Sequence, residues 1–195
     1  VPGITQWYKD SAQVTLTRTD NLSGVQSTKY TIDGGTTLNY FSPFTIQTDG
    51  SHTVNYWSSD KAGNNETQQS RVVNVDVNAP VTQISAGNEF YASPTQVTLT
   101  ATDSGSGVAN TFYRIDSGAT QTYSGPFTVS GDGNRSIVYW SADWAGHTEN
   151  QHFFTLKLDG VAPSTAFSST GTNGWNGWRT SAVQVTLTGT NGAIT

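Results

Sequence analysis

Three histidines are the only side chains whose ordinary pKa lies near neutral pH, and the chain of 195 residues has no cysteine. They are His52, His147 and His152. The sequence contains no Gly-x-Ser-x-Gly elbow, no His-Glu-x-x-His zinc motif and no phosphate-binding glycine loop. We therefore expect no catalytic residue, no bound cofactor and no motif-based metal site, and we predict that the chain is not an enzyme.

Carboxylates are the second group that could do chemistry, because two of them can together hydrolyse a glycosidic bond. The candidates all stand in glycine-rich segments that are typical of turns, where an aspartate usually accepts hydrogen bonds from its own backbone. We therefore favour a structural role over a catalytic one. The six residues concerned are Asp20, Asp33, Asp60, Asp103, Asp116 and Asp143.

A calcium ion is one possible ligand of the segment Asp76-Val-Asn78-Ala-Pro80, because carboxylate and amide oxygens suit this hard cation. A second segment, Asp159-Gly-Val-Ala-Pro163, lacks the asparagine. The alternative is an ordinary linker ended by a proline. A calcium ion at the linker would stiffen the connection between two domains.

The clearest feature of the sequence is an internal repeat with a period of 83 residues. Val14-Thr-Leu-Thr, Tyr56-Trp-Ser and Ala79-Pro80 each recur 83 positions later without a gap, and a third copy begins after Ala162-Pro163. The repeat predicts three parts, 1–78 as a first domain that lacks its first strand, 79–161 as a second and 162–195 as a partial third.

Comparison of the copies also identifies three tryptophans as candidate contacts with a partner or a sugar ring. Trp144 corresponds to Lys61, and a position that accepts both residues is expected to lie exposed at a loop tip. Trp57 and Trp140 correspond to each other. Strict alternation would place both on an outward face, whereas the tryptophan of an immunoglobulin-type sandwich is often buried, so both interpretations stay open.

Within each copy, apolar and polar residues alternate over short runs that are separated by turn signals, and no amphipathic helix is evident. Such a pattern predicts about seven strands in each copy, as in immunoglobulin-like sandwiches. The fold class is therefore all-β, with tandem immunoglobulin-like β-sandwich domains and a partial third repeat. The strands expected in the second copy are 81–85, 96–102, 109–116, 119–123, 126–130, 134–142 and 150–158.

Composition excludes several classes of function. The net charge is −5 and only 12% of residues are charged, without a basic cluster, so we expect no nucleic-acid partner. No apolar run reaches the roughly 20 residues that would cross a bilayer, so we expect no membrane span in this segment.

The series Ser-Gly-Val, Gly-Pro-Phe-Thr, Tyr-Trp-Ser-x-Asp-x-Ala-Gly and Asp-x-x-Ala-Pro resembles the immunoglobulin-like repeats, similar to fibronectin type III, of secreted bacterial surface proteins and multi-domain glycosidases. The resemblance implies an extracellular or cell-surface stalk, adhesin or filament-building segment. Its partners would be other copies of itself, neighbouring repeats, a polysaccharide or a cell surface. The alternative is a carbohydrate-binding or spacer region of a secreted glycoside hydrolase.

Overall fold

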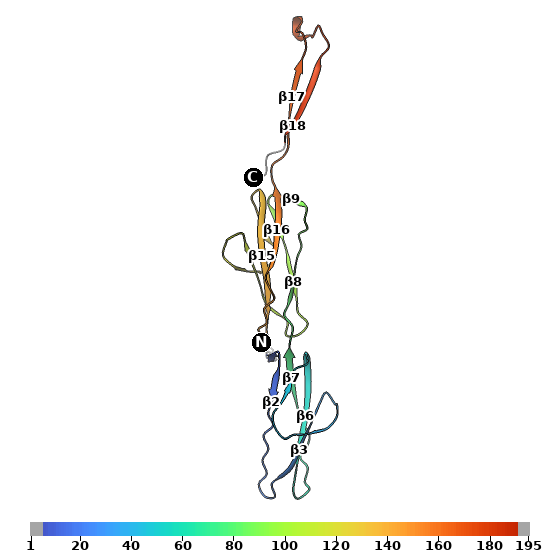
Figure 1. Ribbon diagram of the computed structural model, residues 1–195, viewed down its shortest axis with the longest axis vertical. Coiled ribbons are helices and arrows are strands. Elements are labelled where there is room, and N and C mark those ends of the chain that lie inside the picture. The colour runs from blue at the N-terminus through green and yellow to red at the C-terminus, as the bar shows by residue number, and fades with distance from the viewer. Residues whose placement is uncertain (1–5, 191–195) are drawn as a thin grey trace.

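The computed structural model describes residues 6–190, and nearly all of its regular structure is β-strand. In Figure 1 two sandwiches and a hairpin follow one another along the long axis. The one helical segment in the described residues is a 3-10 turn at Trp175–Gly177. No helix there has the length and apolar character needed to cross a membrane. The prediction of an all-β fold built from sandwiches is confirmed.

The first sandwich, residues 6–76, contains a five-stranded sheet and a two-stranded sheet. The outer strand β1 pairs in parallel with β7, whereas the other pairs are antiparallel. The large sheet has the order β1 (Trp7–Lys9), β7 (Gln69–Asp76), β6 (Gly50–Asp60), β3 (Val25–Ile32) and β4 (Leu38–Asn39), and the small sheet joins β2 (Ala12–Val14) to β5 (Phe44–Ile46).

The second sandwich, residues 81–159, repeats this arrangement and adds one strand pair. Its large sheet has the order β13 (Gln121–Thr122), β12 (Val108–Ile115), β15 (Gly133–Asp143), β16 (His152–Asp159) and β9 (Phe90–Ala92). Its two small sheets pair β10 (Thr95–Val97) with β14 (Phe127–Val129) and β8 (Val81–Ile84) with β11 (Leu99–Thr102). The strand β9, which pairs in parallel with β16, was not expected from the sequence.

The cores explain why these segments form strands, because alternate residues of each strand point inward. In the second sandwich Ile137, Leu156 and Leu158 are fully buried, and the corresponding residues of the first are the smaller Val54, Val73 and Val75. Each core also contains one stacked pair of aromatic rings. The pairs are Tyr30 with Phe44, at a centroid distance of 4.1 Å, and Tyr113 with Phe127, at 3.9 Å.

The hairpin formed by β17 (Ser164–Thr170) and β18 (Gln184–Thr190) has the same register as β8 and β11. Phe167 lies opposite Leu187, as Ile84 lies opposite Leu99. The two hairpin residues are each about two-thirds exposed. The hairpin therefore has the strand pairing that opens a sandwich, and within residues 6–190 no opposite sheet buries its apolar face.

Candidate functional site

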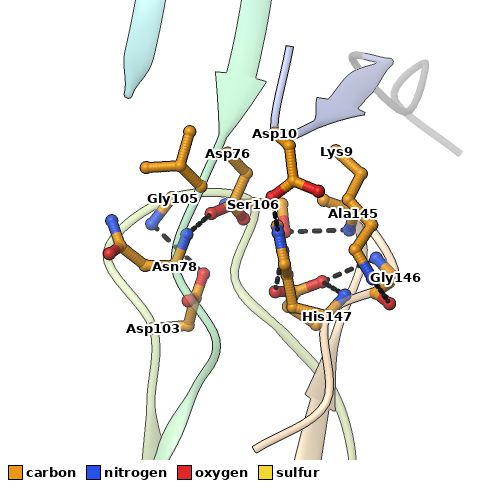
Figure 2. Close-up of polar contacts among 12 residues, drawn as sticks. Lys9, Asp10, Asp76, Asn78, Asp103, Gly105, Ser106, Ala145, Gly146 and His147 are labelled. Carbon is orange, nitrogen blue, oxygen red and sulfur yellow. Dashed lines mark hydrogen bonds and ion pairs between the residues drawn. The ribbon is translucent and has the colours of Figure 1, made fainter. Parts of the chain in front are cut away.

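The densest group of charged side chains in the described residues lies where the two sandwiches meet (Figure 2). The first sandwich contributes the end of β7 and the turn after β1, at Lys9 and Asp10. The second contributes the loop 103–107, after β11, and the loop 143–147, which follows β15. Only a few residues separate β7 from β8, so the chain itself holds these loops close together.

Asp76 joins the first sandwich to the loop 103–107. Its side chain is fully buried, and its Oδ2 accepts a hydrogen bond of 2.7 Å from the backbone N–H of Ser106. Its Oδ1 accepts a second, of 3.1 Å, from the N–H of Asn78. Burial alone would raise the pKa of Asp76, but these hydrogen bonds and nearby His147 together hold it below its ordinary value. Asp76 is therefore a buried charged group whose carboxylate is stabilised by backbone N–H groups of the linker and of the second sandwich.

His147 forms the second connection. Its Nδ1 lies 3.0 Å from Oδ2 of Asp143 and its Nε2 lies 3.0 Å from Oδ1 of Asp10, in the other sandwich. The side chain of His147 is 10% exposed. Burial would lower the pKa of this imidazole, but hydrogen bonds to Asp10 and Asp143 outweigh burial and raise it. Beside it, Nζ of Lys9 donates a hydrogen bond of 2.9 Å to the carbonyl oxygen of Gly146.

Asp103 is the least satisfied carboxylate of the group. Its Oδ1 accepts hydrogen bonds from the N–H groups of Gly105 and Gly107, at 3.1 and 2.6 Å. Its Oδ2 is buried and has no hydrogen-bond partner in the described residues. Burial, together with the charges of Asp76 and Asp143, raises the pKa of Asp103. The junction thus carries more negative than positive charge.

Two aspartates at this junction, Asp103 and Asp143, serve first as turn residues, as the sequence predicted. The same hydrogen bonds occur at the far end of the first sandwich, where no second domain is in contact in the described residues. There Asp20 accepts from the N–H groups of Leu22 and Gly24, and Asp60 accepts from the backbone and side chain of Asn64. Turn formation therefore explains their recurrence without any catalytic role.

Asp76, Asp143 and His147 bring oxygen and nitrogen atoms within 4.8 Å of one another. Asp143 and His147 are hydrogen-bonded to each other, however, and the oxygens of Asp76 accept hydrogen bonds from backbone N–H groups, so these atoms already have partners. Calcium binding at Asp76 and Asn78, which the sequence left open beside an ordinary linker, stays untested.

The three tryptophans do not form one surface. Trp144 is 61% exposed at the tip of the loop 143–147, so its predicted exposure is confirmed. Trp57 on β6 and Trp140 on β15 belong to different sandwiches and are both half-buried, between the two alternatives that the sequence left open. Trp140 stacks on Phe112 at 5.6 Å, whereas Trp57 lies opposite Lys29. Contact with a ligand stays a prediction for all three.

Two arrangements in the described residues resemble part of a hydrolase site. In the first, the exposed hydroxyl of Thr48 lies 3.1 Å from Nε2 of His52, whose Nδ1 faces Asp33. The same Nε2, however, lies 2.9 Å from the backbone carbonyl oxygen of Thr48, to which it must donate, so it cannot act as the base.

The second is a polar network beneath β8. The hydroxyl of Ser141 lies 2.6 Å from that of Thr82, and Glu149 binds both Thr82 and His152. Ser141 is fully buried, and His152 contacts Glu149 rather than a hydroxyl. Nucleophilic catalysis needs a base beside an accessible nucleophile. The network therefore anchors β8 to the sheet and has no group that could attack a substrate.

No family model matches the chain, and no curated protein is significantly similar to it. A search of solved structures finds a chain described under "Structures of Clostridium thermocellum CbhA fibronectin(III)-like modules". The two chains are 12% identical with a TM-score of 0.39, and the match covers 80% of this chain and 90% of that one. At this identity and TM-score the likeness supports no conclusion about the function of this chain.

A titratable ion pair distinguishes the two sandwiches. His52 Nδ1 lies 2.7 Å from Oδ2 of Asp33, and at the corresponding positions Arg135 Nη2 lies 2.8 Å from Oδ2 of Asp116. The hydrogen bond to Asp33 raises the pKa of His52 above 6.5, and the hydrogen bond from His52 lowers the pKa of Asp33 below 3.8. An arginine stays charged throughout this range.

We expect the first sandwich to lose stability as pH rises through the raised pKa of His52, because the charged imidazole is then lost. The contribution is fully present at pH values between 3.8 and 6.5 and is lost again as pH falls through the lowered pKa of Asp33. Asp33 is half-exposed, so the pair contributes no more than about 1 kcal/mol. Urea unfolding of the wild type and His52→Arg at about pH 6 and about pH 8.5 measures it. An equal loss of stability in both proteins would contradict this assignment.

Proposed function

We propose that the chain is a structural segment that spaces or presents other parts of an extracellular surface protein, as a stalk or adhesive array of similar domains. The observation that carries the proposal is the direct contact between consecutive sandwiches. Asp76 is buried against the loop 103–107, and Lys9 and Asp10 contact the loop 143–147. A connection made by such contacts resists bending, whereas a flexible linker bends freely.

Repetition supports the same function. Domains joined end to end by short connections produce an elongated body whose length grows with the number of copies. The recurring sequence, the recurring strand order and the placement of the sandwiches in Figure 1 all agree with this arrangement. In the described residues the exposed hydroxyl beside a histidine is that of Thr48, and the Nε2 of His52 that it faces donates to the backbone carbonyl of Thr48, so we propose a mechanical rather than catalytic role.

Small-angle X-ray scattering of the purified chain tests the proposal. We expect a monomer whose maximum dimension and cross-section fit the two sandwiches in the arrangement of Figure 1. Insertion of a flexible Gly-Ser segment after Asn78 is the matched control, because it separates the sandwiches without changing either core. If the wild type and the insertion variant scatter alike, the sandwiches already move independently and the chain is not a stiff spacer.

Carbohydrate binding is the second candidate, and the exposed ring of Trp144 favours it. An exposed tryptophan ring can stack on the apolar face of a sugar, and tryptophan is enriched at binding surfaces. We expect Trp144→Ala to abolish any retention on insoluble polysaccharide, whereas Phe153→Ala, which removes another exposed ring, leaves it unchanged. Equal retention of both variants would exclude this binding mode.

A further inference from the structure

We propose that His147 is a proton-operated latch that fixes the two sandwiches to each other when the imidazole is doubly protonated and releases them when it is not. The inference rests on the proposed function, since it states what controls the stiffness of the connection. Nδ1 of His147 faces a carboxylate of its own loop, that of Asp143, and Nε2 faces a carboxylate of the other sandwich, that of Asp10.

An ionised carboxylate has no proton to donate and can only accept hydrogen bonds. Both ring nitrogens of His147 must therefore donate. A neutral imidazole carries one N–H and can satisfy only one of them. Asp143 also accepts from the backbone N–H groups of Gly146 and His147, which fix its position within the turn. Deprotonation therefore gives up the bond to Asp10, which crosses between the sandwiches, and leaves two carboxylates beside an uncharged ring.

The charged groups around His147 all favour its protonated form except one. Asp143 comes from its own loop, Asp10 from the turn after β1 and Asp76 from the end of β7, whereas Asp103, from the loop after β11, interacts with Asp76 and Asp143. Among the described residues, the cation beside this group is Lys9, whose Nζ donates to the carbonyl oxygen of Gly146. The carboxylates of Asp10 and Asp143, which bind the two ring nitrogens, hold a proton on the imidazole above the pH at which a free histidine loses it.

Comparison with the other copy shows that both halves of the latch are special to this junction. The first sandwich has Asn64 where the second has His147, and the second has Ser93 where the first has Asp10. Asn64 forms the same turn, because its side-chain amide donates to Asp60 at 2.8 Å. The turn therefore does not require a histidine, and the reach of Nε2 across the junction is what the histidine adds.

These natural differences supply the variants. His147→Asn keeps the turn in the form that the first sandwich uses, and Asp10→Ser removes the partner with the residue that the second sandwich uses. Asp10 is mostly exposed, so its replacement changes neither core, but its backbone φ of 63° is one that serine rarely adopts. Asparagine tolerates this φ and removes the charge, so Asp10→Asn is measured beside Asp10→Ser. Asn64→His is the control, because it places a histidine in the same turn where no other sandwich faces it in the described residues.

Nuclear magnetic resonance relaxation at about pH 6 and about pH 8.5 tests the latch, in buffer with EDTA and again with calcium, so that a bound cation is not mistaken for a proton. For the wild type we expect one common rotational correlation time at the lower pH and two shorter, independent ones at the higher pH. The latch variants are expected to behave at either pH as the wild type does at the higher pH, whereas Asn64→His follows the wild type.

The imidazole itself gives a readout that a merely structural residue would not. In the wild type both ring nitrogens of His147 should carry protons at the lower pH, and its titration midpoint should fall toward 6.5 in Asp10→Ser. A midpoint that is unchanged by Asp10→Ser overturns the latch. So does a common correlation time at both pH values, although that result leaves the stiff spacer intact, whereas independent tumbling under all conditions contradicts both proposals.

Discussion

Replacement of Leu156 by alanine is expected to lower the free energy of unfolding of the second sandwich by about 2–5 kcal/mol. Leu156 lies on β16, is fully buried and belongs to the cluster that contains Ile137 and Leu158. The loss combines the transfer of its apolar atoms to water with the cavity left between two sheets that cannot close fully. Guanidinium unfolding followed by tryptophan fluorescence measures it.

The control for this substitution lies on the same strand. Phe153→Ala removes a larger side chain that is 72% exposed, and its effect should stay within about 0.5 kcal/mol. The first sandwich should unfold in both variants as it does in the wild type. A loss for Phe153→Ala as large as that for Leu156→Ala would mean that Phe153 is also buried and that its face of β16 is not exposed.

Gly105→Leu is expected to open the junction between the sandwiches. A Cβ atom at Gly105 would lie 2.5 Å from Cγ of Asp76, a separation that real Cβ atoms essentially never show. The Asp76 carboxylate must therefore move away from the loop 103–107, and its hydrogen bond from the backbone N–H of Ser106 is broken. A hydrogen bond to a charged group contributes about 1.5–3 kcal/mol. The sandwiches should then tumble independently, with the amide signal of Ser106 strongly shifted.

The chain offers natural support for this substitution. The first sandwich has Leu22 at the corresponding position, where the side chain is 98% exposed and the turn is formed by the same aspartate hydrogen bonds. Leucine is thus compatible with the turn, but not with the Asp76 carboxylate in its position against this loop. Gly189→Ala is the control, because no atom lies within 4 Å of the added Cβ. If Gly105→Leu leaves the Ser106 signal unchanged, Asp76 does not dock there.

Periodicity was sufficient to predict most of the strands, because a buried face imposes alternation whatever the partner. All seven strands expected in the second sandwich have counterparts, although 96–102 divides into β10 and β11. The strand β9 was missed because its residues, Phe90–Ala92, are mostly exposed and pair only at the edge of the sheet, which leaves no alternating pattern.

The junction could be predicted only in part. The sequence indicated the linker residues Asp76 and Asn78 as candidate oxygen ligands. The contact of Asp10 with His147, however, joins residues 137 positions apart and depends on how two domains meet. One signal was present in the sequence. Where the copies differ, as Gly105 differs from Leu22 and His147 from Asn64, the second copy has the residue that the contact needs. Differences between repeats therefore indicated the interface better than their identities did.

The parallel pairing of β9 with β16 has a mechanical consequence. The chain enters the second sandwich through β8, continues into β9 and leaves through β16, and Phe90, Tyr91 and Ala92 lie beside Lys157, Leu158 and Asp159. Tension applied between the two neighbours of this sandwich pulls these strands lengthwise in opposite directions. Their hydrogen bonds are then loaded together in shear and must break at once, whereas an antiparallel pair opened from one end would yield one bond at a time. The strand β1, paired with β7, gives the first sandwich the same protection.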